Sequence, residues 1–557
     1  MSVFTRRLAD RQPDPEGRRW LYVAYDQLTD RIGPLSREEP EELGIVLIES
    51  SWKAGRRPYH KQKLAAVLAN QRQFALEQAE RGVAVRYVAT GRPYRNMLAE
   101  LAAELGPLRA MEPAERELRV ALTPLAEAGL LDLVPHEGWL TTASDFEASQ
   151  GDGPPYRMDA FYRQVRREYD ILMEDGKPRG GKYSFDAENR ESWNGEPAAP
   201  EPPRFPNDEI KEEVGALIDE HFDRHPGVLN LEAVPTSRED AGRLWDWAKS
   251  ECMEDFGPYE DAMSTRSRGL FHTRISTLLN LHRLLPQQVM EDVASLDAPL
   301  ASVEGFIRQV LGWREFVRHV HRCTDGLRSL PEMAVEVAET PGDGGYARWR
   351  GAAWDASKTR DGLDGGATPS FLGSDAPLPV AYWGAPSGLS CLDHVVSDVW
   401  ATGYGHHITR LMVLSNIATL IDTSPRELTD WFWCAYTDAY DWVVEPNVLG
   451  MGTFAVGDLM TTKPYVSGSN YIDRMSDYCD GCAFDPKKNC PIANLYWAFL
   501  ERRRDALEDN PRLRLPLASA KKRSTAKKKR DRATFEWVKE TLAKGERLRP
   551  DEAPTED

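Results

Sequence analysis

The sequence Tyr478-Cys-Asp-Gly-Cys482, followed by Cys490-Pro491, closes a stretch from Trp383 to Trp497 that holds most of the chemically informative residues of the chain. The C-x2-C spacing lets two thiolates of one tight turn face a single metal centre. A cysteine followed by proline at the end of a cysteine-rich run is typical of iron–sulfur ligation. A structural zinc site more often uses a second C-x2-C or a histidine pair. With Cys391 as a fourth ligand, the cysteines suffice for a [4Fe–4S] cluster; the alternative is a chance grouping of buried free thiols.

Length and composition bound the class of protein. A chain of 557 residues exceeds what one hydrophobic core holds, so two or more domains are expected. Seven cysteines are an odd number, which argues against a disulfide framework. No targeting segment or membrane-length apolar run is visible, and we expect a cytoplasmic monomer that meets no membrane. The net charge of −18 does not indicate a polyanion partner, although DNA binding depends on a local basic patch.

Residues 1–140 alternate between strand-like and helix-like patterns. Such alternation is typical of a parallel sheet, so this part is predicted to be an α/β, Rossmann-like domain. No G-x-G-x-x-G follows its first strand, which excludes an ordinary dinucleotide fingerprint. The predicted strands lie at 19–25, 44–49 and 83–88, and the predicted helices at 59–81 and 95–105.

The remainder of the chain is predicted to be helical after a linker. A proline-rich run at 191–206 marks the linker, which we place at 141–207, and an all-helical domain follows at 208–515. A charged C-terminal tail at 516–557 includes the basic run 521–532, which is either a solvated, frayed segment or an electrostatic handle on nucleic acid. The main helical patterns cover 240–256, 289–296, 301–322, 391–420 and 426–442.

Several motifs in consistent order carry a resemblance to a known family. Trp313-Arg-Glu-Phe316, within a predicted helix, resembles the signature helix of the photolyase/cryptochrome superfamily. The segments 157–163 and 172–190 resemble the interdomain region of its iron–sulfur bacterial branch, whose characterised repair members act on (6-4) photoproducts. The segments 462–482 and 490–497 resemble the cluster domain of that branch, although the spacer before the last cysteine is shorter here.

This resemblance implies an N-terminal antenna domain, a helical FAD-binding domain and a [4Fe–4S] cluster on Cys391, Cys479, Cys482 and Cys490. The segment 272–276 resembles one that holds the FAD diphosphate, a role that suits hydroxyls and backbone amides at a helix start. An ordinary capped helix is the alternative. Arg410 and Asp438 match a salt bridge beside the isoalloxazine ring, and an unrelated helix–helix ion pair is the alternative. The implied FAD-binding residues are His272, Thr273, Arg274, Ser276, Gln309, Trp313, Arg314, Arg410, Asp438 and Tyr440.

The resemblance also implies a lesion-binding site. His407 matches the lesion-facing residue of the family, and an imidazole with an ordinary pKa of about 6.5 can donate and recover a proton at neutral pH. His406 is adjacent, and on one helix the two side chains would point about 100° apart. Tyr465 and Tyr471 match tyrosines of the lesion pocket.

Two tryptophans match an electron-transfer chain to the flavin. These are Trp383 and Trp431, although tryptophans are more often core residues and the chain has 16 of them. Where family members often place a Tyr after the second Trp, this sequence has Phe432, whose ring is redox-poor. The sequence therefore does not show which side chain connects the two indoles.

Other positions depart from the family pattern. Val444 stands where related enzymes carry a Glu that faces flavin N5, and Glu445 comes one position later. An apolar side chain cannot protonate the flavin. The stretch 341–376, rich in Gly and Asp, is expected to be a long surface loop and resembles an insertion relative to the family.

The resemblance implies a 6,7-dimethyl-8-ribityllumazine antenna bound by Asp26, Gln27 and Glu49. Here too the pattern is altered, because Tyr25 replaces a glycine and Lys53 stands where an acidic residue is common.

Three functions are considered on this basis. The first is light-dependent repair of UV-damaged DNA, most simply of the (6-4) photoproduct, by electron transfer from photoexcited reduced FAD to a flipped-out lesion. The second is a cryptochrome-type blue-light photoreceptor without repair activity, which Val444 and the long loop favour. The third is an iron–sulfur nucleic-acid-binding protein that has lost its flavin, which Arg410, Asp438 and the Trp313–Phe316 motif disfavour.

Overall fold

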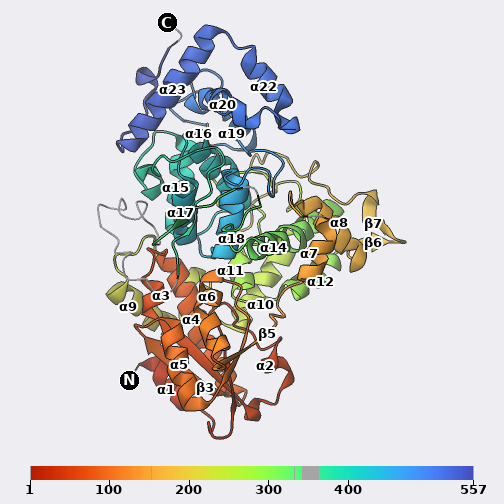
Figure 1. The fold of residues 1–557 in the computed structure, drawn as a ribbon, viewed down its shortest axis with the longest axis vertical. Coiled ribbons are helices and arrows are strands. Elements are labelled where there is room, and N and C mark those ends of the chain that lie inside the picture. The colour runs from red at the N-terminus through yellow and green to blue at the C-terminus, as the bar shows by residue number, and fades with distance from the viewer. Residues whose placement is uncertain (1, 152, 332, 341–362, 556–557) are drawn as a thin grey trace.

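A five-stranded parallel sheet forms the N-terminal part of the chain (Figure 1), with the strand order β3-β2-β1-β4-β5. The computed structural model describes residues 2–151, 153–331, 333–340 and 363–555. The predicted α/β, Rossmann-like domain is confirmed, and two strands that the sequence reading did not identify, β4 and β5, complete its sheet. The strands are β1 Arg19–Tyr22, β2 Leu43–Ser50, β3 Ala84–Thr90, β4 Leu108–Met111 and β5 Leu131–Val134.

The central strands are buried on both faces. Every residue of β2 is buried, which is why its sequence reads as an apolar run rather than as an alternating pattern. Gly44 on β2 lies against the ring of Trp20 on β1, where a Cβ atom would approach a ring carbon to 2.6 Å. The helices of this part are α1 Val3–Ala9, α2 Pro34–Arg37, α3 Ser51–Ala54, α4 Lys61–Glu80, α5 Tyr94–Leu105 and α6 Arg116–Glu127.

The segment predicted as a linker contains ordered elements at its N-terminal end. Helices α7 (Ala143–Gln150) and α8 (Met158–Glu168) and the small hairpin of β6 (Met173–Glu174) and β7 (Lys177–Pro178) lie at one side of the helical part. Phe161 of α8 is fully buried. Only the proline-rich remainder, from residue 182 to 208, is extended chain.

The C-terminal part is helical, as predicted, and holds the larger core (Figure 1). Its helices are α9 Glu209–His221, α10 Arg238–Trp247, α11 Ser276–Asn280, α12 Pro286–Ala294, α13 Leu300–Ile307, α14 Glu315–Cys323, α15 Ser390–Thr402, α16 Asn416–Leu420, α17 Pro425–Ala435, α18 Asp441–Val444, α19 Ser469–Met475, α20 Pro491–Arg502, α21 Arg504–Leu507, α22 Arg514–Lys521 and α23 Thr525–Ala543.

Wide π-helical turns interrupt several of these helices. They are common at functional sites because they re-aim side chains within an otherwise regular helix. Within the described residues the π segments are η4 Ala248–Cys252, η5 Arg308–Arg314, η8 Thr409–Ser415 and η9 Glu445–Gly452. The 3-10 segments are η1 Pro40–Glu42, η2 Arg179–Gly181, η3 Leu231–Ala233, η7 Val380–Trp383, η10 Pro511–Leu513 and η11 Pro550–Glu552.

The continuous helix predicted over 391–420 is wrong. Helix α15 ends at Thr402, and Gly403 adopts the left-handed conformation with φ of +66° that commonly terminates helices. The chain then runs without regular structure through His406, and the next helix begins at His407. The two adjacent histidines therefore do not share one helix.

The segment 516–557 is not a frayed tail. Ser524 caps α23, accepting a hydrogen bond from the backbone amide of Lys527, and Phe535, Val538 and Leu542 of that helix are buried. Helix α23 packs against α20 at the top of Figure 1. The basic run 521–532 therefore spans the end of α22, the turn that follows and the first turns of α23, and its lysines and arginines are exposed or half-buried.

Part of the expected surface loop lies outside the described residues, namely 341–362. At its two ends, β8 (Val337–Ala338) pairs with β9 (Gly366–Ala367) in antiparallel orientation. Among the residues that the structure describes, no helix combines the length and apolar character required to cross a membrane.

A buried cation joins the sheet domain to the helical domain. Arg57, fully buried between α3 and α4, donates two hydrogen bonds to Glu117 of α6, at 2.7 and 3.2 Å. Its guanidinium also lies 3.8 Å from the ring centre of Trp433 on α17. The backbone amide of Glu117 in turn donates to Asp441 of α18 at 3.0 Å. The contact between the sheet domain and the helical domain is thus stabilised by charged side chains of each domain that bind residues of the other.

Replacing Arg57 with Met should destabilise the protein by about 3 kcal/mol, because the buried carboxylate of Glu117 loses its closest partner. The matched control is Arg11→Met, which removes an exposed ion pair to Glu80 and should cost less than about 1 kcal/mol. Urea unfolding at pH 7 measures both changes. Equal midpoints for the two variants would contradict the assigned role of Arg57.

Candidate active site in the helical domain

A buried ion pair lies at the centre of the helical domain. Arg410, on η8, donates to both carboxylate oxygens of Asp438 at 3.1 and 2.9 Å, and its Nε donates to the carbonyl of Gly405 at 2.8 Å. Burial alone would raise the pKa of Asp438, but the charge and hydrogen bonds of Arg410, with a hydrogen bond from Ser276, hold that pKa below its ordinary value. The pair therefore stays ionised, with Arg410 lying 4.0 Å above the ring of Tyr436.

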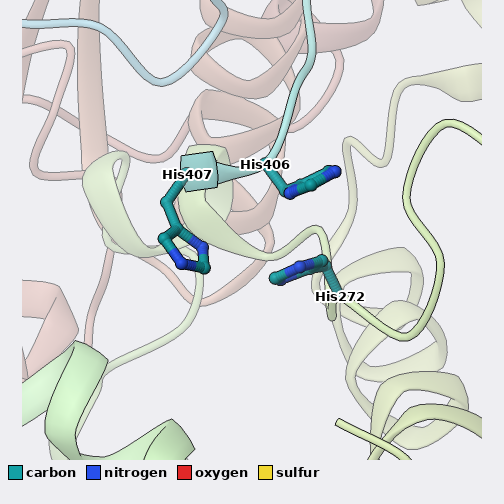
Figure 2. A group of neighbouring side chains, drawn as sticks. All are labelled: His272, His406 and His407. Carbon is teal, nitrogen blue, oxygen red and sulfur yellow. The ribbon is translucent and has the colours of Figure 1, made fainter. Parts of the chain in front are cut away.

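Three histidines, His272, His406 and His407, lie close together, as Figure 2 shows. The rings of His272 and His406 stack with their centres 4.5 Å apart and their planes 12° from parallel. The ring of His407 approaches His272 edge-on, at 5.5 Å and 72°. His272 comes from the loop before α11, so two distant segments of the chain meet here.

Burial separates the protonation states of these histidines. It lowers the pKa of His272 and of His406 well below the ordinary value, because a charged imidazole is poorly solvated there and the neighbouring cations disfavour it further. Burial acts on His407 in the same direction, but Asp261 and Glu260 outweigh it and raise the pKa of His407. At neutral pH the proton in this cluster therefore belongs on His407.

Ring nitrogens of the three histidines lie within 4.8 Å of one another, a separation that a metal ion can bridge. The lone pair of an imidazole nitrogen, however, lies in the plane of its ring. The planes of His272 and His406 are nearly parallel and stacked, so one ion cannot lie in both. We therefore assign no metal to this cluster.

Asp261 connects His407 to a predicted lesion-pocket tyrosine. Nε2 of His407 lies 3.5 Å from Oδ1 of Asp261, and the hydroxyl of Tyr471 donates to Oδ2 at 3.5 Å. Nε of Arg190 lies 3.9 Å from the same carboxylate. The side chain of His407 is 39% exposed, whereas His272 and His406 are buried. His407 therefore marks the side of the histidine cluster that faces solvent.

Tyr465 lies near the same opening, within reach of the charges of Arg190, Asp186 and Arg512. Burial raises its pKa, so its hydroxyl stays protonated at neutral pH. Tyr471 and His407 thus share Asp261, and both tyrosines have Arg190 as a charged neighbour. Arginines are the side chains that pair with phosphates most readily.

The residues expected to hold FAD are only partly brought together. Thr273 is buried beside His272, and Arg274, with φ of +56°, places its guanidinium 5.4 Å from the ring of Tyr404. Gln309 donates to Glu260 at 2.5 Å. These residues line the histidine cluster and the ion pair.

Three of the expected FAD residues face elsewhere. Trp313 packs on Phe316, with ring centres 6.1 Å apart. Arg314 lies over Trp139 at 4.3 Å, and Tyr440 stacks near Tyr25 of the sheet domain at 6.4 Å. They connect the helical domain to the preceding parts of the chain.

Several buried polar atoms of these side chains find no hydrogen-bond partner in the described part of the chain. Such atoms cost about 1–3 kcal/mol each when left unsatisfied, so they favour a polar ligand. A cofactor with an anionic diphosphate and a heteroaromatic ring fits this mixture of cationic donors, neutral imidazoles and hydroxyls. The atoms are His272 Nε2, Arg274 Nε, His406 Nδ1 and Tyr436 Oη.

The four predicted cluster cysteines converge. Cys391 begins α15, Cys490 precedes α20, and Cys479 and Cys482 flank Gly481, whose φ of +75° permits the tight turn. Burial raises the pKa of Cys391 well above its ordinary value, and the other three thiols raise it further. Four cysteines that influence one another's charge would be stabilised as thiolates by a cationic centre, which fits a metal cluster.

The two predicted electron-transfer tryptophans do not touch directly. Trp383 stacks on Trp400, with ring centres 5.4 Å apart and planes 20° from parallel, and Trp400 meets Trp431 at 5.8 Å and 87°. Sequence reasoning missed Trp400, as it missed Asp261 and Tyr436. Trp400 lies within the helical pattern predicted from Cys391, but no sequence feature distinguished this residue among the 16 tryptophans.

The predicted antenna residues separate into two groups. Asp26 and Gln27 are buried, and Oδ1 of Asp26 and Oε1 of Gln27 have no partner in the described chain. Burial raises the pKa of Asp26 to about 7. Glu49 is instead bound on both oxygens by Arg72, at 2.8 and 2.9 Å. Glu49 is thus a partner of Arg72 rather than a free acceptor.

Glu445 does not substitute for the glutamate that Val444 replaces. Both side chains are buried, but the carboxylate of Glu445 accepts from His321 at 2.8 Å and from Arg426 at 2.9 Å. Burial would raise the pKa of Glu445, yet these partners and Arg328 lower it to about 2. A carboxylate held in this way carries no proton to donate.

Comparisons with known proteins agree with this architecture. A family model described as deoxyribodipyrimidine photo-lyase-related protein matches residues 21–233. The chain is 32% identical to the (6-4) photolyase of Agrobacterium fabrum over 517 residues, which cover 90% of this chain and 94% of that protein.

Two solved structures share the fold. A bacterial class III photolyase from Agrobacterium tumefaciens and a Synechocystis cryptochrome each superpose with a TM-score of 0.54 at 14% identity. The matches cover 94% and 91% of this chain, respectively, and 98% of each structure. With the long sequence match to the A. fabrum protein, they establish that the chain belongs to the photolyase/cryptochrome family.

Proposed function

We propose that this protein is a light-dependent DNA repair enzyme that acts on the (6-4) pyrimidine photoproduct. The observation that carries the proposal is a half-exposed histidine, His407, whose pKa Asp261 raises and which shares that carboxylate with Tyr471. The sequence similarity to the A. fabrum (6-4) photolyase supports it. (6-4) repair needs both an electron and a proton, and this site is suited to supply the proton.

FAD is the cofactor that the site fits. The residues that would hold it are His272, Thr273, Arg274 and Ser276 on the diphosphate side and Arg410 with Asp438 beside the ring. When bound in its reduced form, FAD supplies the light-driven electron that the protein itself cannot provide. The contribution of the chain is to bind, orient and exclude water.

His407 moves the proton. Asp261 raises the pKa of His407 and so favours its charged form, which can donate a proton to the group that must leave one base and return to the other. The carboxylate of Asp261 stabilises the charged imidazole and afterwards favours recovery of a proton. His406 and His272, neutral and buried, are unsuited to this step.

The lesion is held by the tyrosines and arginines around His407. A base must leave the duplex to approach a cofactor buried in a helical domain, and a damaged pair is inexpensive to unstack. Tyr465 and Tyr471 offer aromatic faces for the extruded bases, and Arg190 offers charge for the adjacent phosphate.

The cysteine group is proposed to carry a [4Fe–4S] cluster on Cys391, Cys479, Cys482 and Cys490. Convergence of four thiols from three segments and the proline after the last one support this assignment. Because the segments are far apart in sequence, the cluster would tie α15, α20 and the turn between Cys479 and Cys482 together.

A lumazine antenna is proposed only for the region of Asp26 and Gln27, whose buried oxygens are unpartnered within the described residues. Glu49 has no part in it, because Arg72 holds that carboxylate.

One observation favours a second function, a blue-light photoreceptor without repair activity. Val444 is apolar and buried, and the carboxylate of Glu445 is bound by His321 and Arg426, so neither of these two residues offers the carboxylic acid with which related enzymes protonate the flavin. Restoration of lesions decides between the two functions.

Illumination of the reduced holoprotein should restore oligonucleotides that contain a (6-4) photoproduct, and His407→Asn should lower that rate by about 100-fold or more, since the general acid is lost. The flavin absorption spectrum should be unchanged. His221→Asn, an exposed histidine on α9, is the control and should repair like the wild type.

Chromatographic analysis of (6-4) and cyclobutane dimer substrates, treated in parallel, measures the outcome. Restoration of neither lesion by the wild type would favour the photoreceptor. Unchanged repair by His407→Asn would remove His407 from the mechanism.

The pH dependence of repair should have an alkaline limit set by His407. The reactive imidazolium exists below its pKa, so the rate should fall as pH rises through that value. Asp261→Asn removes the group that raises the pKa, so the fall should begin at lower pH. Asp159→Asn, an exposed carboxylate on α8, is the control. A pH profile of single-turnover repair that is the same in all three proteins would refute the pairing.

Anaerobic purification should yield about four iron and four sulfide per chain, with a broad charge-transfer absorption band, because four thiolates complete one such cluster. Cys479→Ser should lose that iron, and Cys323→Ser, an exposed cysteine outside the group, should keep it. Metal analysis that gives one zinc per chain instead would replace the iron–sulfur assignment with a structural zinc site.

A further inference from the structure

Lysines and arginines gather at the C-terminal end of the helical domain, around the turn from α22 to α23 (Figure 1). Residues 521–532 contain eight of them against one aspartate, in a chain whose net charge is −18. Four lysines of this run are exposed, and no carboxylate of the described chain lies within ion-pair distance of them. They are Lys521, Lys522, Lys527 and Lys529.

The loop between Cys482 and Cys490 adds two cations to the same surface. The side chains of Lys487 and Lys488 are 77% and 81% exposed. Arg530 of α23 donates a hydrogen bond to the backbone carbonyl of Lys488 at 3.4 Å, so the loop and the helix lie against each other. Residues 487–488 and 521–532 together form one surface, which we call the basic end.

The basic end is held in place by neighbouring carboxylates and by a buried helix side. Arg523 binds both oxygens of Asp531, at 2.7 and 2.8 Å, and Lys528 lies 3.4 Å from Glu501 of α20. The first turn of α23 contains no acidic residue, although an acidic residue there would stabilise the helix and a cation does not. The exposed lysines therefore add positive charge to the surface without stabilising the helix that carries them.

The basic end adjoins the helix that carries Tyr471. The hydroxyl of Ser469, at the start of α19, donates to the carbonyl of Pro486 at 2.7 Å. Asp473 of the same helix lies 3.8 Å from Lys487. Because Tyr471 lies between these two contacts on a helix of seven residues, the basic end is a direct neighbour of the proposed lesion site but lies outside it.

These features favour a nucleic acid over a membrane as the partner. A helix that binds a lipid surface needs an exposed apolar face, whereas Phe535, Val538 and Leu542 of α23 are buried. A cluster of ammonium groups fits a chain of phosphates, since each lysine that neutralises a phosphate releases a counterion. Continuity with the proposed lesion site selects DNA among the nucleic acids.

We propose that the basic end binds the phosphate backbone of duplex DNA beside the lesion, whatever its sequence and whether or not it is damaged; this step rests on the proposed function. Contacts to phosphates position a protein on a duplex but carry no sequence information. The lysines accordingly increase the affinity for any duplex, and the site around His407 selects the lesion.

The test is binding of the holoprotein to an undamaged, fluorescent duplex of about 30 base pairs, followed by anisotropy from about 50 to 200 mM salt. Replacing Lys521, Lys522, Lys527 and Lys529 with Gln should weaken binding by about 10-fold or more. The slope of log K against log salt should fall by about one for each lysine that contacts a phosphate. Replacement of the same lysines with Arg should preserve binding, because a guanidinium also pairs with phosphate.

The matched control removes four exposed cations of the sheet domain, by replacing Arg6, Arg86, Arg92 and Arg95 with Gln. It changes the net charge equally and should bind like the wild type, because salt screens charges that lie far from the duplex. Equal losses in the two Gln variants, or no loss in the lysine variant, would overturn the proposal. Lysine-dependent binding to vesicles of anionic phospholipid, without lysine-dependent binding to the duplex, would also overturn it.

Repair assays separate this proposal from that of repair. A short single-stranded oligonucleotide with a (6-4) photoproduct reaches the site of His407 but offers no flanking duplex. Its repair by the reduced, illuminated protein should not depend on the four lysines, whereas repair of the same lesion in a long duplex at limiting protein should. Failure of the wild type to restore either substrate refutes repair alone, and duplex binding that is indifferent to the lysines refutes the basic end alone.

Discussion

An ionised pair buried in a helical core is the constraint on which the site depends. Desolvating Arg410 and Asp438 is costly, and the cost is offset only when the remaining donors and acceptors are also satisfied. Arg410 therefore binds the carbonyl of Gly405 as well as Asp438, and Asp438 accepts from Ser276. These contacts fix three segments that are distant in sequence, and each segment carries residues of the site.

The pair also explains why adjacent histidines have different chemistry. Gly405 is held by Arg410, so His406 follows it into the core and His407 turns toward the open side. Burial beside cations keeps His406 neutral, while Asp261 and Glu260 keep a proton on His407. One break in the helix thus produces a neutral imidazole and a charged one from two neighbouring residues.

The sequence alone was sufficient for the alternating sheet and for the residues that carry family motifs. The apolar run of β2 predicts a strand that is buried throughout, and the cysteine spacing predicts ligands of a shared centre. Asp261 and Trp400 were not predictable, because their roles come from contacts across long sequence separations, 3.5 Å to His407 and 5.4 Å to Trp383. The helix break at Gly403 was also missed, since glycine in an apolar pattern indicates either a kink or an end. The many charged residues of α23 suggested a tail, because the apolar residues that fix this helix form only a narrow stripe along it.

Arg410 contacts both the segment that carries His407 and the ring of Tyr436. On one side it binds the backbone that presents His407 to the exterior, and on the other it covers Tyr436, beyond which the three tryptophans begin. In the proposed repair reaction, a reductant and DNA would not compete for the same opening if they approached from these two sides. The contacts of Arg410 reach both sides, so a change in its geometry would disturb the segment that carries His407 and the packing of Tyr436 together.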